Sequence, residues 1–511
     1  MQQLDRSHNS SSHNFSFREG SPDLAQTICS ESDSTGSSTT AASSSLRSDS
    51  SSDKSAPSVT RNVGSLRDSL ALWAYQHNIT HCALSDLLKT LQPFVAERIP
   101  ADARTLLRTP VGTITPRQFG GGEFHYFGLE RGILKSAEQG LTNFQFPFLR
   151  DATSTDLITI SVNVDGLPLS KSSKSQFWPI LGILDQSLLQ VPFLVAIFYG
   201  QSKPNSLDMF LADFVNEACI LQQNGVIIGT KKFRFRVSTI LADAPARSFL
   251  KNCSIFNSYY GCERCDQKGT WKKRVVFLEN DAMPRTDAIF DKMTDPNHNS
   301  CKSPLTKQQL GLVSQIPIDH MHLLFLVVMK KLIKTWVRGK LPHKLGSSSV
   351  RSISDKLKGL SSYLPKEFTR RPRPIDEFTF YKATEFRTFM LYTGVVCLYK
   401  NMDDIRYKHF LDLHCGVFIL LSESAADLEW NNLANSLLRK FVDNVPEFYS
   451  KTYLVYNVHN LIHISEDARR YGNLSRVSCF HYANYMQQMK KFVRGNKHFV
   501  QQVVHRVTKS N

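Results

Sequence analysis

Two cysteines at a short spacing are the first residues in this sequence that could bind a metal ion. Cys262 and Cys265 form a Cys-x-x-Cys pair, with Gly261 before it and Gly269 after it. A tight turn of this kind can bring two thiolates within about 2.3 Å of one zinc ion, as half of a four-ligand site. Coincidence and redox chemistry are the alternatives for an isolated pair.

Histidines at a spacing of four residues could complete such a site, and two pairs have this spacing. They are His77 and His81, in HNITH, and His459 and His463, in HNLIH. Four residues apart on a helix, two imidazoles lie on one side. The first pair straddles a turn expected at residues 78–80, so we favour the second. Two unrelated surface histidines are the alternative; with the cysteines, the second pair predicts a closed, structural Cys2His2 site.

Two aspartates stand where strands are expected to end. Apolar residues alternate with polar ones over residues 158–164, which predicts a β-strand with one buried face, and Asp165-Gly166 follows it. Asp243 follows residues 231–241 in the same manner. A carboxylate at the end of a core strand suits a metal ion, because the strand fixes its position and the loop keeps it hydrated. An ordinary Asp-Gly turn is the alternative for Asp165.

A third cluster consists of Asp319 and His322, in Asp-His-Met-His, at the start of an apolar helical stretch. These two residues could hold a second ion or support the aspartates. The alternative is that Asp319 caps the helix that follows.

The candidate residues must be positioned by strands and helices, and the sequence pattern around them predicts an α/β protein. Strands are expected at residues 158–164, 177–184, 191–199 and 231–241, with a short aromatic strand at 124–127 and a helix at 207–222. Three strands, a helix and a further strand are typical of the start of a mixed sheet. Residues 317–449 are mainly helical in pattern, which indicates a long helical insertion, and further helices are expected at 455–464 and 482–494.

The chain divides into five expected segments. They are a disordered Ser-rich tail (1–60), a helical N-terminal region with its connector (61–150), core strands with the cysteine pair (151–270), the mainly helical insertion (271–450) and C-terminal helices carrying the histidine pair (451–511). Within residues 66–91 we expect two short helices, packed as a hairpin or, alternatively, as a DNA-reading helix-turn-helix. The chain stops at Asn511 without an evident helix cap, which suggests truncation.

The overall charge favours a polyanionic partner. The 511 residues carry a formal net charge of +17, and 41% of them are hydrophobic, enough for a large core. DNA is the simplest such partner, and a generally basic solvated surface is the alternative. The predicted phosphate contacts are Lys171, Lys174, Arg247, Arg370, Arg371 and Arg373.

The cysteines and the apolar runs exclude secreted and membrane classes. The ten cysteines are mostly scattered, and the N-terminus is polar, without a secretory signal. No apolar run reaches the roughly 18 to 20 residues of a membrane span. We therefore expect a reducing, intracellular compartment, where Cys262 and Cys265 bind a metal ion rather than form a disulfide.

Several stretches together resemble the transposase domain of CACTA-type (En/Spm-like) DNA transposons. In order they are NVDGLPLSKSSKSQFWPILG, ADAPAR, YYGCERC, IDHMHLLFLVVMKKL, YKATEFRTFMLYTG and HNLIHISEDARRYGNL. The resemblance covers roughly residue 66 to the C-terminus. It implies an RNase H-like mixed-sheet core interrupted by a helical insertion, similar in plan to Transib transposases and to the recombinase that assembles antigen-receptor genes. It also implies a nuclear protein that acts on DNA, with assembly into homo-oligomers and no small-molecule substrate.

The resemblance implies a catalytic set of two aspartates and a glutamate that hold two Mg²⁺ (or Mn²⁺) ions. By motif, Asp165 and Asp243 are the aspartates, and the glutamate position, in FHYANY at residues 480–485, is Ala483. The structural zinc ligands fall on Cys262, Cys265, His459 and His463.

A methyl group binds no metal, so we expect DNA cleavage and strand transfer to be impaired. Two alternatives stand beside this reading. Another carboxylate could substitute and keep the transposase active, or the chain could be a host-adopted, non-enzymatic scaffold that binds DNA or protein.

Overall fold

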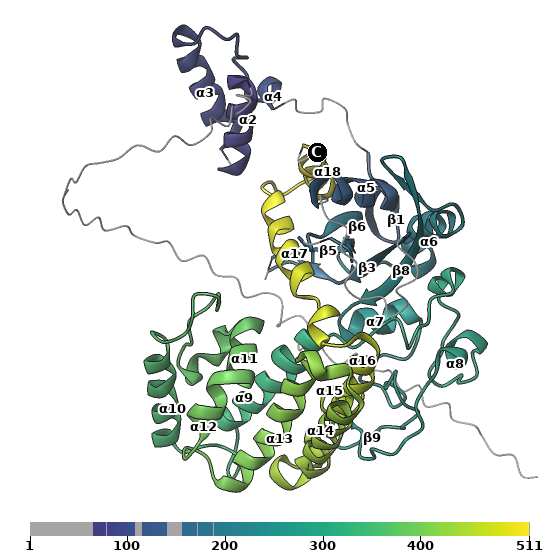
Figure 1. Cartoon of the computed structure of the whole chain (residues 1–511), viewed down its shortest axis with the longest axis vertical. Helices are drawn as coiled ribbons and strands as arrows, with labels where there is room; N and C mark the ends of the chain where they lie inside the picture. Colours follow the sequence, from purple (N-terminus) through teal and green to yellow (C-terminus); the bar gives the residue numbers. More distant parts are fainter. Residues whose placement is uncertain are drawn as a thin grey trace, which may run out of the picture.

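The structure, a computed structural model, describes residues 65–77, 79–107, 115–140, 156–170, 172–187 and 189–509. The predicted disordered tail lies outside these residues. A sheet with helices on both faces lies between three N-terminal helices and a lobe of helices formed by residues 330–471 (Figure 1). The prediction of a mixed α/β fold is thus confirmed, while the division into five segments stays a prediction.

The N-terminal helices pack on one another around a small apolar core of their own. They are α2 (Leu66–Gln76), α3 (His81–Leu91) and α4 (Ala103–Leu106). The hydroxyl of Thr80 accepts a hydrogen bond from the amide of Ala83 and so caps α3. His77 lies beyond the end of α2 while His81 opens α3. The first histidine pair therefore does not share a helix, as the expected turn indicated.

The sheet has the strand order β1-β2-β6-β5-β3-β8-β7, and β4 pairs with β5 beside this path. Only the pair of β3 and β8 is parallel among these strands; the other pairs are antiparallel. The strands are β1 (Arg117–Phe119), β2 (Gly122–Tyr126), β3 (Leu157–Val164), β4 (Leu167–Pro168), β5 (Gln176–Leu184), β6 (Phe193–Gly200), β7 (Val226–Ile228) and β8 (Lys231–Leu241). The longer strands fall where the sequence predicted them, to within a few residues.

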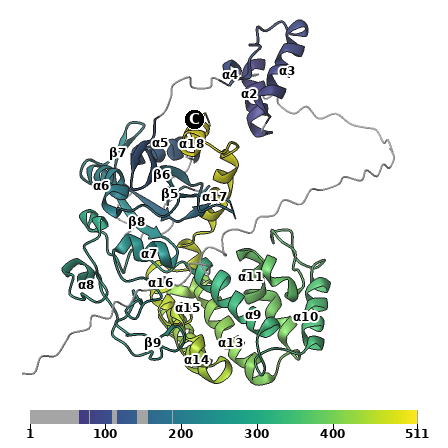
Figure 2. The ribbon, with the colours of Figure 1, turned by 180° about the vertical axis from the view of Figure 1, so that it is seen from behind.

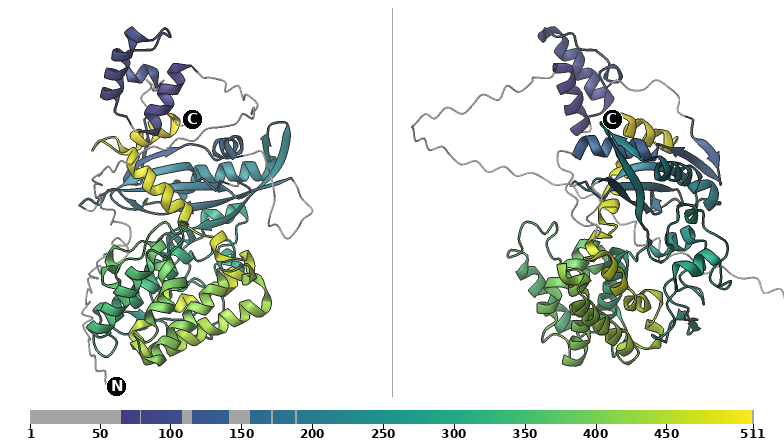
Figure 3. Two further views of the ribbon diagram at one scale, coloured as in Figure 1. Left: turned by 60° about the vertical axis from the view of Figure 1, so that its left-hand side comes forward. Right: turned by 45° about the vertical axis from the view of Figure 1, so that its right-hand side comes forward.

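Helices α5 (Leu129–Gly140) and α6 (Leu207–Asn224) cover one face of the sheet. The apolar row of β3, including Ile158 and Val162, shares a buried cluster there with Phe210 and Phe214 of α6. The opposite face carries α17 (Phe480–Phe492) and α18 (Phe499–Lys509). Helix α17 runs from the helical lobe along the sheet to α18 (Figure 3), whose Phe499 stacks on Tyr199 of β6 at 4.7 Å between ring centroids.

The prediction that β3 has only one buried face is wrong. Thr159 and Asn163, on its polar face, are also buried. Helix α17 covers this face, and the hydroxyl of Tyr482 donates to the carbonyl oxygen of Ser161 at 2.9 Å. The side chain of Gln186 bonds both the amide and the hydroxyl of Thr159. These polar residues are buried because partners from elsewhere in the chain satisfy them, which is the usual condition for burying polar groups.

The chain between β8 and α17 forms the turn that carries Cys262 and Cys265 and the helical lobe, which Figure 2 shows from behind. The nitrogen of Trp336 donates to the Tyr449 hydroxyl at 3.0 Å and ties α9 to α14 in the lobe's interior. The prediction of a mainly helical stretch is confirmed. The elements are α7 (Ala244–Lys251), β9 (Thr270–Trp271), β10 (Val275–Val276), α8 (Asp287–Lys292), the π-helix η3 (Met321–Met329), α9 (Lys330–Arg338), α10 (Ser347–Leu360), α11 (Ala383–Thr388), α12 (Gly394–Leu398), α13 (Asp404–Leu420), α14 (Leu428–Tyr449), α15 (Tyr456–His459) and α16 (Ile464–Tyr471).

Candidate metal centres

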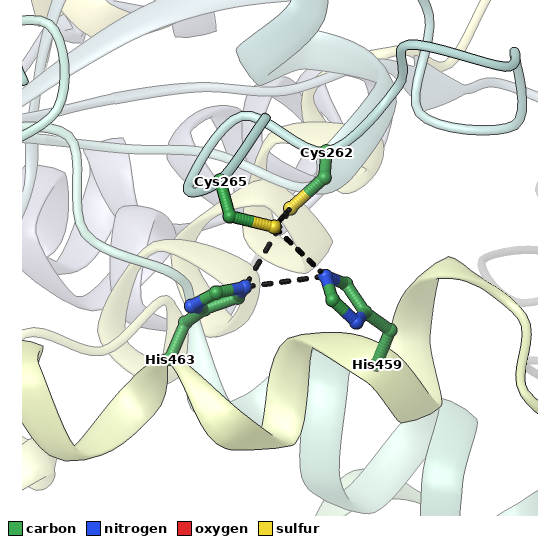
Figure 4. Close-up of side chains that lie close together, drawn as sticks. All are labelled: Cys262, Cys265, His459 and His463. Carbon is green, nitrogen blue, oxygen red and sulfur yellow. Dashed lines mark hydrogen bonds between the residues drawn. The ribbon is translucent and has the colours of Figure 1, made fainter. Parts of the chain in front are cut away.

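Cys262, Cys265, His459 and His463 converge on one point between the core and the helical lobe (Figure 4). The two sulfur atoms are 3.5 Å apart, and the two Nε2 atoms are 3.2 Å apart. Sulfur–nitrogen distances are 3.2 Å from Cys265 to His459 and 3.6 Å from Cys262 to His463.

These separations can be compared with the edges of a metal-centred tetrahedron. Bond lengths of about 2.3 Å to sulfur and about 2.05 Å to nitrogen give edges of about 3.8, 3.6 and 3.3 Å for sulfur–sulfur, sulfur–nitrogen and nitrogen–nitrogen. The observed edges fall within a few tenths of an ångström of these values. The four side chains are thus arranged as a group that could hold one metal ion.

The cysteine turn is held by its surroundings. A side chain at Gly261 would meet the carbonyl oxygens of Ile255 and Phe256 at 2.6 Å, so this close backbone approach requires glycine. The Nε of Arg285 donates to the carbonyl oxygens of Cys262 and Cys265 at 3.0 and 2.9 Å. The close approach at Gly261 and the hydrogen bonds from Arg285 together fix the backbone of the turn.

The histidine pair is carried on a different local structure from the predicted one. The expected helix over residues 455–464 is instead the short α15, ending at His459, and the 3-10 turn η8 (Asn460–Ile462), after which His463 follows. The ring of His459 stacks on Phe277 at 5.0 Å. Burial lowers the pKa of His463, and the hydrogen bond between Cys265 and Cys262 lowers the pKa of the Cys265 thiol. Both shifts favour the protonation states that bind a metal ion.

Asp165 and Asp243 meet at one edge of the sheet. Asn163 and Leu241 are partners in the parallel pair of β3 and β8, and each aspartate lies two residues beyond. Asp243 caps α7, its Oδ1 accepting from the amide of Ala246 at 2.8 Å, while Oδ1 of Asp165 accepts from Gly166 at 2.7 Å. Burial and the nearby charge of Asp243 raise the pKa of Asp165 well above its usual range.

Asp319 and His322 lie beside this aspartate pair. One oxygen of Asp319 accepts from the amide of Cys479 at 2.9 Å. The other accepts from the amide of His322 at 2.9 Å and contacts its Nδ1 at 2.7 Å. Asp319 thus bonds the first turn of the helix that follows and also fixes the ring of His322. Burial would lower the pKa of His322, but Asp319, with added effects of Asp165 and Asp243, raises it to about 9.

Residue 483, where the family resemblance implies the third acid, is an alanine in α17. Ala483 is in the first turn of α17, where its amide donates to the carbonyl oxygen of Cys479 at 2.8 Å. Neither nearby acid in the sequence substitutes for a glutamate there. Glu466 pairs on the surface with Arg470, and Asp467 is buried against Arg264 at 2.9 Å.

The predicted phosphate contacts have different environments. Lys174, Arg370 and Arg371 are exposed, whereas Arg373 is half-buried and forks onto both carboxylate oxygens of Glu385. Lys171 lies outside the described residues. The prediction for Arg247 is wrong, because its guanidinium is buried and occupied by Glu263, the carbonyl of Ala242 and the hydroxyl of Tyr456.

Arg247 belongs to a buried charge cluster behind the cysteine turn. The carboxylate of Glu263 lies 2.6 Å from Nε of Arg247 and 3.3 Å from Nζ of Lys251. Burial alone would raise the pKa of Glu263, but the two cations hold it below its ordinary value. The cluster joins α7, which Asp243 caps, to the turn that carries Cys262 and Cys265.

Sequence reasoning missed two residues that assemble these sites. The amide nitrogen of Asn163 donates to the carbonyl of Leu241 at 2.9 Å and lies 3.5 Å from the sulfur of Cys479. Asn163 shares the strand face of Asp165, and that alternation was the available signal. Nothing in the sequence indicates Cys479, whose contacts come from residues far away in the chain.

A scan against protein-family models and a search of curated proteins gave no match for this chain. Among the described residues, no helix has both the length and the apolar character needed to cross a bilayer.

Replacing Glu263 by glutamine should destabilise the fold strongly. Arg247 and Lys251 would remain buried without a counter-charge, and breaking a buried pair in this manner costs about 3 to 5 kcal/mol. The free energy of unfolding from urea titration measures the loss. The matched control is Glu466→Gln, which removes an exposed pair and should change stability by about 0.5 kcal/mol or less. Equal effects of the two substitutions would contradict the assigned role of Glu263.

Proposed function

We propose that this chain is a transposable-element-derived, DNA-binding protein of the CACTA transposase type, whose DNA cleavage is impaired. The observation that carries the proposal is the meeting of Asp165 and Asp243 at the ends of the parallel strands β3 and β8, with Ala483 in the helix beside them. The nucleus as location and a homo-oligomeric assembly are part of the same proposal and rest on the family resemblance.

The sheet supports an RNase H-like core. Strands β3, β5 and β6 follow one another as antiparallel neighbours, and α6 then leads to β8, which pairs in parallel with β3. The long helical stretch between β8 and α17 corresponds to the insertion that the resemblance implies before the last catalytic position.

Zinc is the ion proposed for Cys262, Cys265, His459 and His463. Two thiolates and two imidazoles in a tetrahedral set are typical of structural zinc and leave no position open for a substrate. The ligands come from the turn after α7 and from the C-terminal segment, and Cys265 and His459 are 194 residues apart in the chain. An ion there would clamp the helical lobe to the core.

The acidic edge supports both the proposed ancestry and the proposed impairment. Two divalent cations between carboxylates can activate a water or a 3′-hydroxyl and stabilise the leaving oxygen of a phosphodiester. Asp165 and Asp243 supply carboxylates that suit such ions. Ala483 offers no ligand, and the described residues place neither Glu466 nor Asp467 at this edge. A non-enzymatic scaffold for DNA or protein is the alternative function, favoured by this missing acid.

The proposed zinc clamp predicts one zinc ion per chain. Cys265→Ser and His459→Ala should each lose the ion and lower the midpoint of thermal unfolding, because a structural zinc contributes directly to folding. Inductively coupled plasma mass spectrometry gives the stoichiometry. Cys301→Ser, a change at an exposed cysteine outside the cluster, is the control and should keep its zinc. Full zinc content in both ligand variants would refute the assignment.

Restoring the acid should restore cleavage. We expect Ala483→Glu to nick supercoiled plasmid in Mn²⁺ roughly 100-fold or more faster than the chain as given, because it returns a ligand to the two-ion site. Adding Asp165→Asn should abolish the gain. His481→Glu, an acid placed on an exposed position of the same turn, is the matched control and should not nick. Asp165-dependent nicking by the unaltered chain would show instead that Ala483 is not disabling.

DNA binding should depend on the exposed basic residues. Lys174→Gln together with Arg370→Gln should weaken binding to a mixed-sequence duplex and reduce the slope of log K against log salt by about 2, one for each lost phosphate contact. Fluorescence anisotropy at several salt concentrations measures the slope. Lys451→Gln, at an exposed lysine two residues beyond the end of α14, is the control. A slope that stays unchanged in the double variant would rule out these contacts.

A further inference from the structure

We propose that the groove between α5 and the α17–α18 pair binds a single strand of DNA, with its phosphates at Arg131 and Lys135 and its bases against aromatic side chains. The inference rests on the proposed function, since it takes DNA as the polyanionic partner. It goes further in naming a contact surface remote from Asp165 and Asp243 and the form of DNA that fits it.

A groove of about 310 Å³ lies where three parts of the chain meet. Helix α5 forms one side, α17 and α18 form another, and the chain between β5 and β6 contributes Leu189 and Val191, which expose 60% and 54% of their surfaces. That volume equals a cube about 7 Å on a side, much narrower than a duplex, whose major groove alone is about 12 Å wide. The groove therefore suits a nucleotide unit of a single strand.

The position of α5 is fixed by close packing and by a cap. A side chain at Gly132 would meet the ring of Phe193 in β6 at 2.1 Å, so this approach of helix and sheet requires glycine. The carboxylate of Glu217 accepts hydrogen bonds from the amides of Leu129 and Glu130 at 2.7 and 3.0 Å. The first turn of α5 is thus already capped, and the positive charge in the groove comes from side chains.

Two cations of α5 line the groove. Arg131 and Lys135 are four residues apart and so share one helix face, where like charges destabilise each other. Burial and the charge of Arg131 lower the pKa values of Lys135 and His125. Within the described part of the chain, Arg131 makes no hydrogen bond or ion pair, and neither acid of α5, Glu130 or Glu138, lines the groove. A phosphate here would offset the repulsion through charge-assisted hydrogen bonds.

The side formed by α17 and α18 is also basic. Residues 480–509 contain six lysines and arginines and no aspartate or glutamate. The guanidinium of Arg506 donates to the carbonyl oxygen of Lys491 at 3.2 Å, and Gln502 accepts from the amide of Gly495 at 2.9 Å. These bonds fix the turn between the two helices. The groove therefore lies between two positively charged elements, which attract a polyanion.

Aromatic side chains decide which polyanion fits. Phe127, Tyr485 and Phe492 line the groove, and each is half-buried. Cations that follow the backbone, combined with rings that stack on the bases, are the usual means of binding single-stranded nucleic acid. In a duplex the bases are stacked on one another and their faces are not available. Inorganic phosphate would leave the aromatic rings without a partner, so a single strand uses both features of the groove.

The groove is remote from the acidic edge. Strand β5 runs antiparallel to β3, with Leu184 opposite Ile160, so the chain that follows β5 lies at the end of the sheet away from Asp165. The eight residues of β3 separate the two ends by about 26 Å. Helices α5 and α18 accordingly lie away from the helical lobe (Figure 1). A strand in the groove is held at a distance from the aspartates and is not the bond to be cleaved.

The experiment is binding of a fluorescein-labelled oligothymidine of about 15 nucleotides to the full chain with its zinc loaded, followed by fluorescence anisotropy. Arg131→Gln should weaken binding roughly 5-fold at about 0.1 M salt and lower the slope of log K against log salt by about 0.7, the value for one single-strand phosphate contact. Because Arg131 is exposed, the fold should remain intact. Arg351→Gln, at an exposed arginine of α10, is the matched control and should change neither quantity.

A second variant and a cross-linking measurement locate the strand. Val191→Glu places a carboxylate at an exposed position of the groove and should weaken binding more than Arg131→Gln, because it adds repulsion. Photo-cross-linking with 5-iodouracil in the oligonucleotide should join it to Phe127, Tyr485 or Phe492, the rings on which bases would stack. Cross-links confined to other parts of the chain overturn the proposal, and so does unchanged oligothymidine binding in both variants.

Competition identifies the occupant. Thymidine monophosphate should displace the oligothymidine only at a much higher nucleotide concentration, because a strand makes several contacts at once. Displacement at equal nucleotide concentration would make the groove a site for free nucleotides and overturn the assignment of a strand. An unaltered chain that does not bind oligothymidine overturns it as well.

The outcomes also distinguish this inference from the proposed function. If the chain binds duplex DNA through Lys174 and Arg370 but oligothymidine binding ignores Arg131→Gln and Val191→Glu, the proposed function stands and the groove assignment fails. If the groove binds the strand but Ala483→Glu does not nick DNA, the groove assignment stands and the impaired transposase fails.

Discussion

The parallel pairing of β3 with β8 is the constraint on which the rest of this structure depends. Parallel neighbours end at the same edge of a sheet, so the register of Asn163 with Leu241 brings Asp165 and Asp243 together. The two like charges repel, and this repulsion adds to the burial of Asp165 in raising its pKa. The fold must then supply positive charge at that edge, and the segment around Asp319 and His322 is positioned to do so.

That edge is closed by segments that are remote in sequence. Helix α17 satisfies the polar face of β3 through Tyr482, and Cys479 at its start bonds Asp319. Asp467 bonds Arg264 and the amide of Ile318 within the interior. Each contact leaves a buried group unpaired if it is removed, which costs more than the contact itself contributes. The helical lobe and the core are therefore coupled through polar contacts as well as through apolar packing.

The sequence was informative where a local pattern determines the outcome. Alternation located β3 and β8, and spacing selected the two cysteines and two histidines that the structure brings together. The sequence was uninformative where the contacts of a residue come from distant segments of the chain. The burial of Asn163 and the contacts of Cys479 depend on α17 lying across β3. Arg247 was misjudged because a basic side chain carries no local sign that Glu263 will enclose it.

Under the proposed function, the separation of the two candidate metal centres would explain how such a fold outlasts the loss of a catalytic acid. Closing the chain over the 194 residues between Cys265 and His459 costs about 5 kcal/mol by loop entropy, which grows only with the logarithm of length. A structural zinc ion contributes about 10 to 16 kcal/mol in small domains, more than that cost. The proposed clamp is independent of position 483, where alanine packs partly buried against the core. A buried glutamate at that place would require a cation to neutralise it, whereas alanine requires none. Loss of the acid would therefore abolish DNA cleavage. It would also remove a buried, unpaired charge that would destabilise the fold whenever no metal ion is bound.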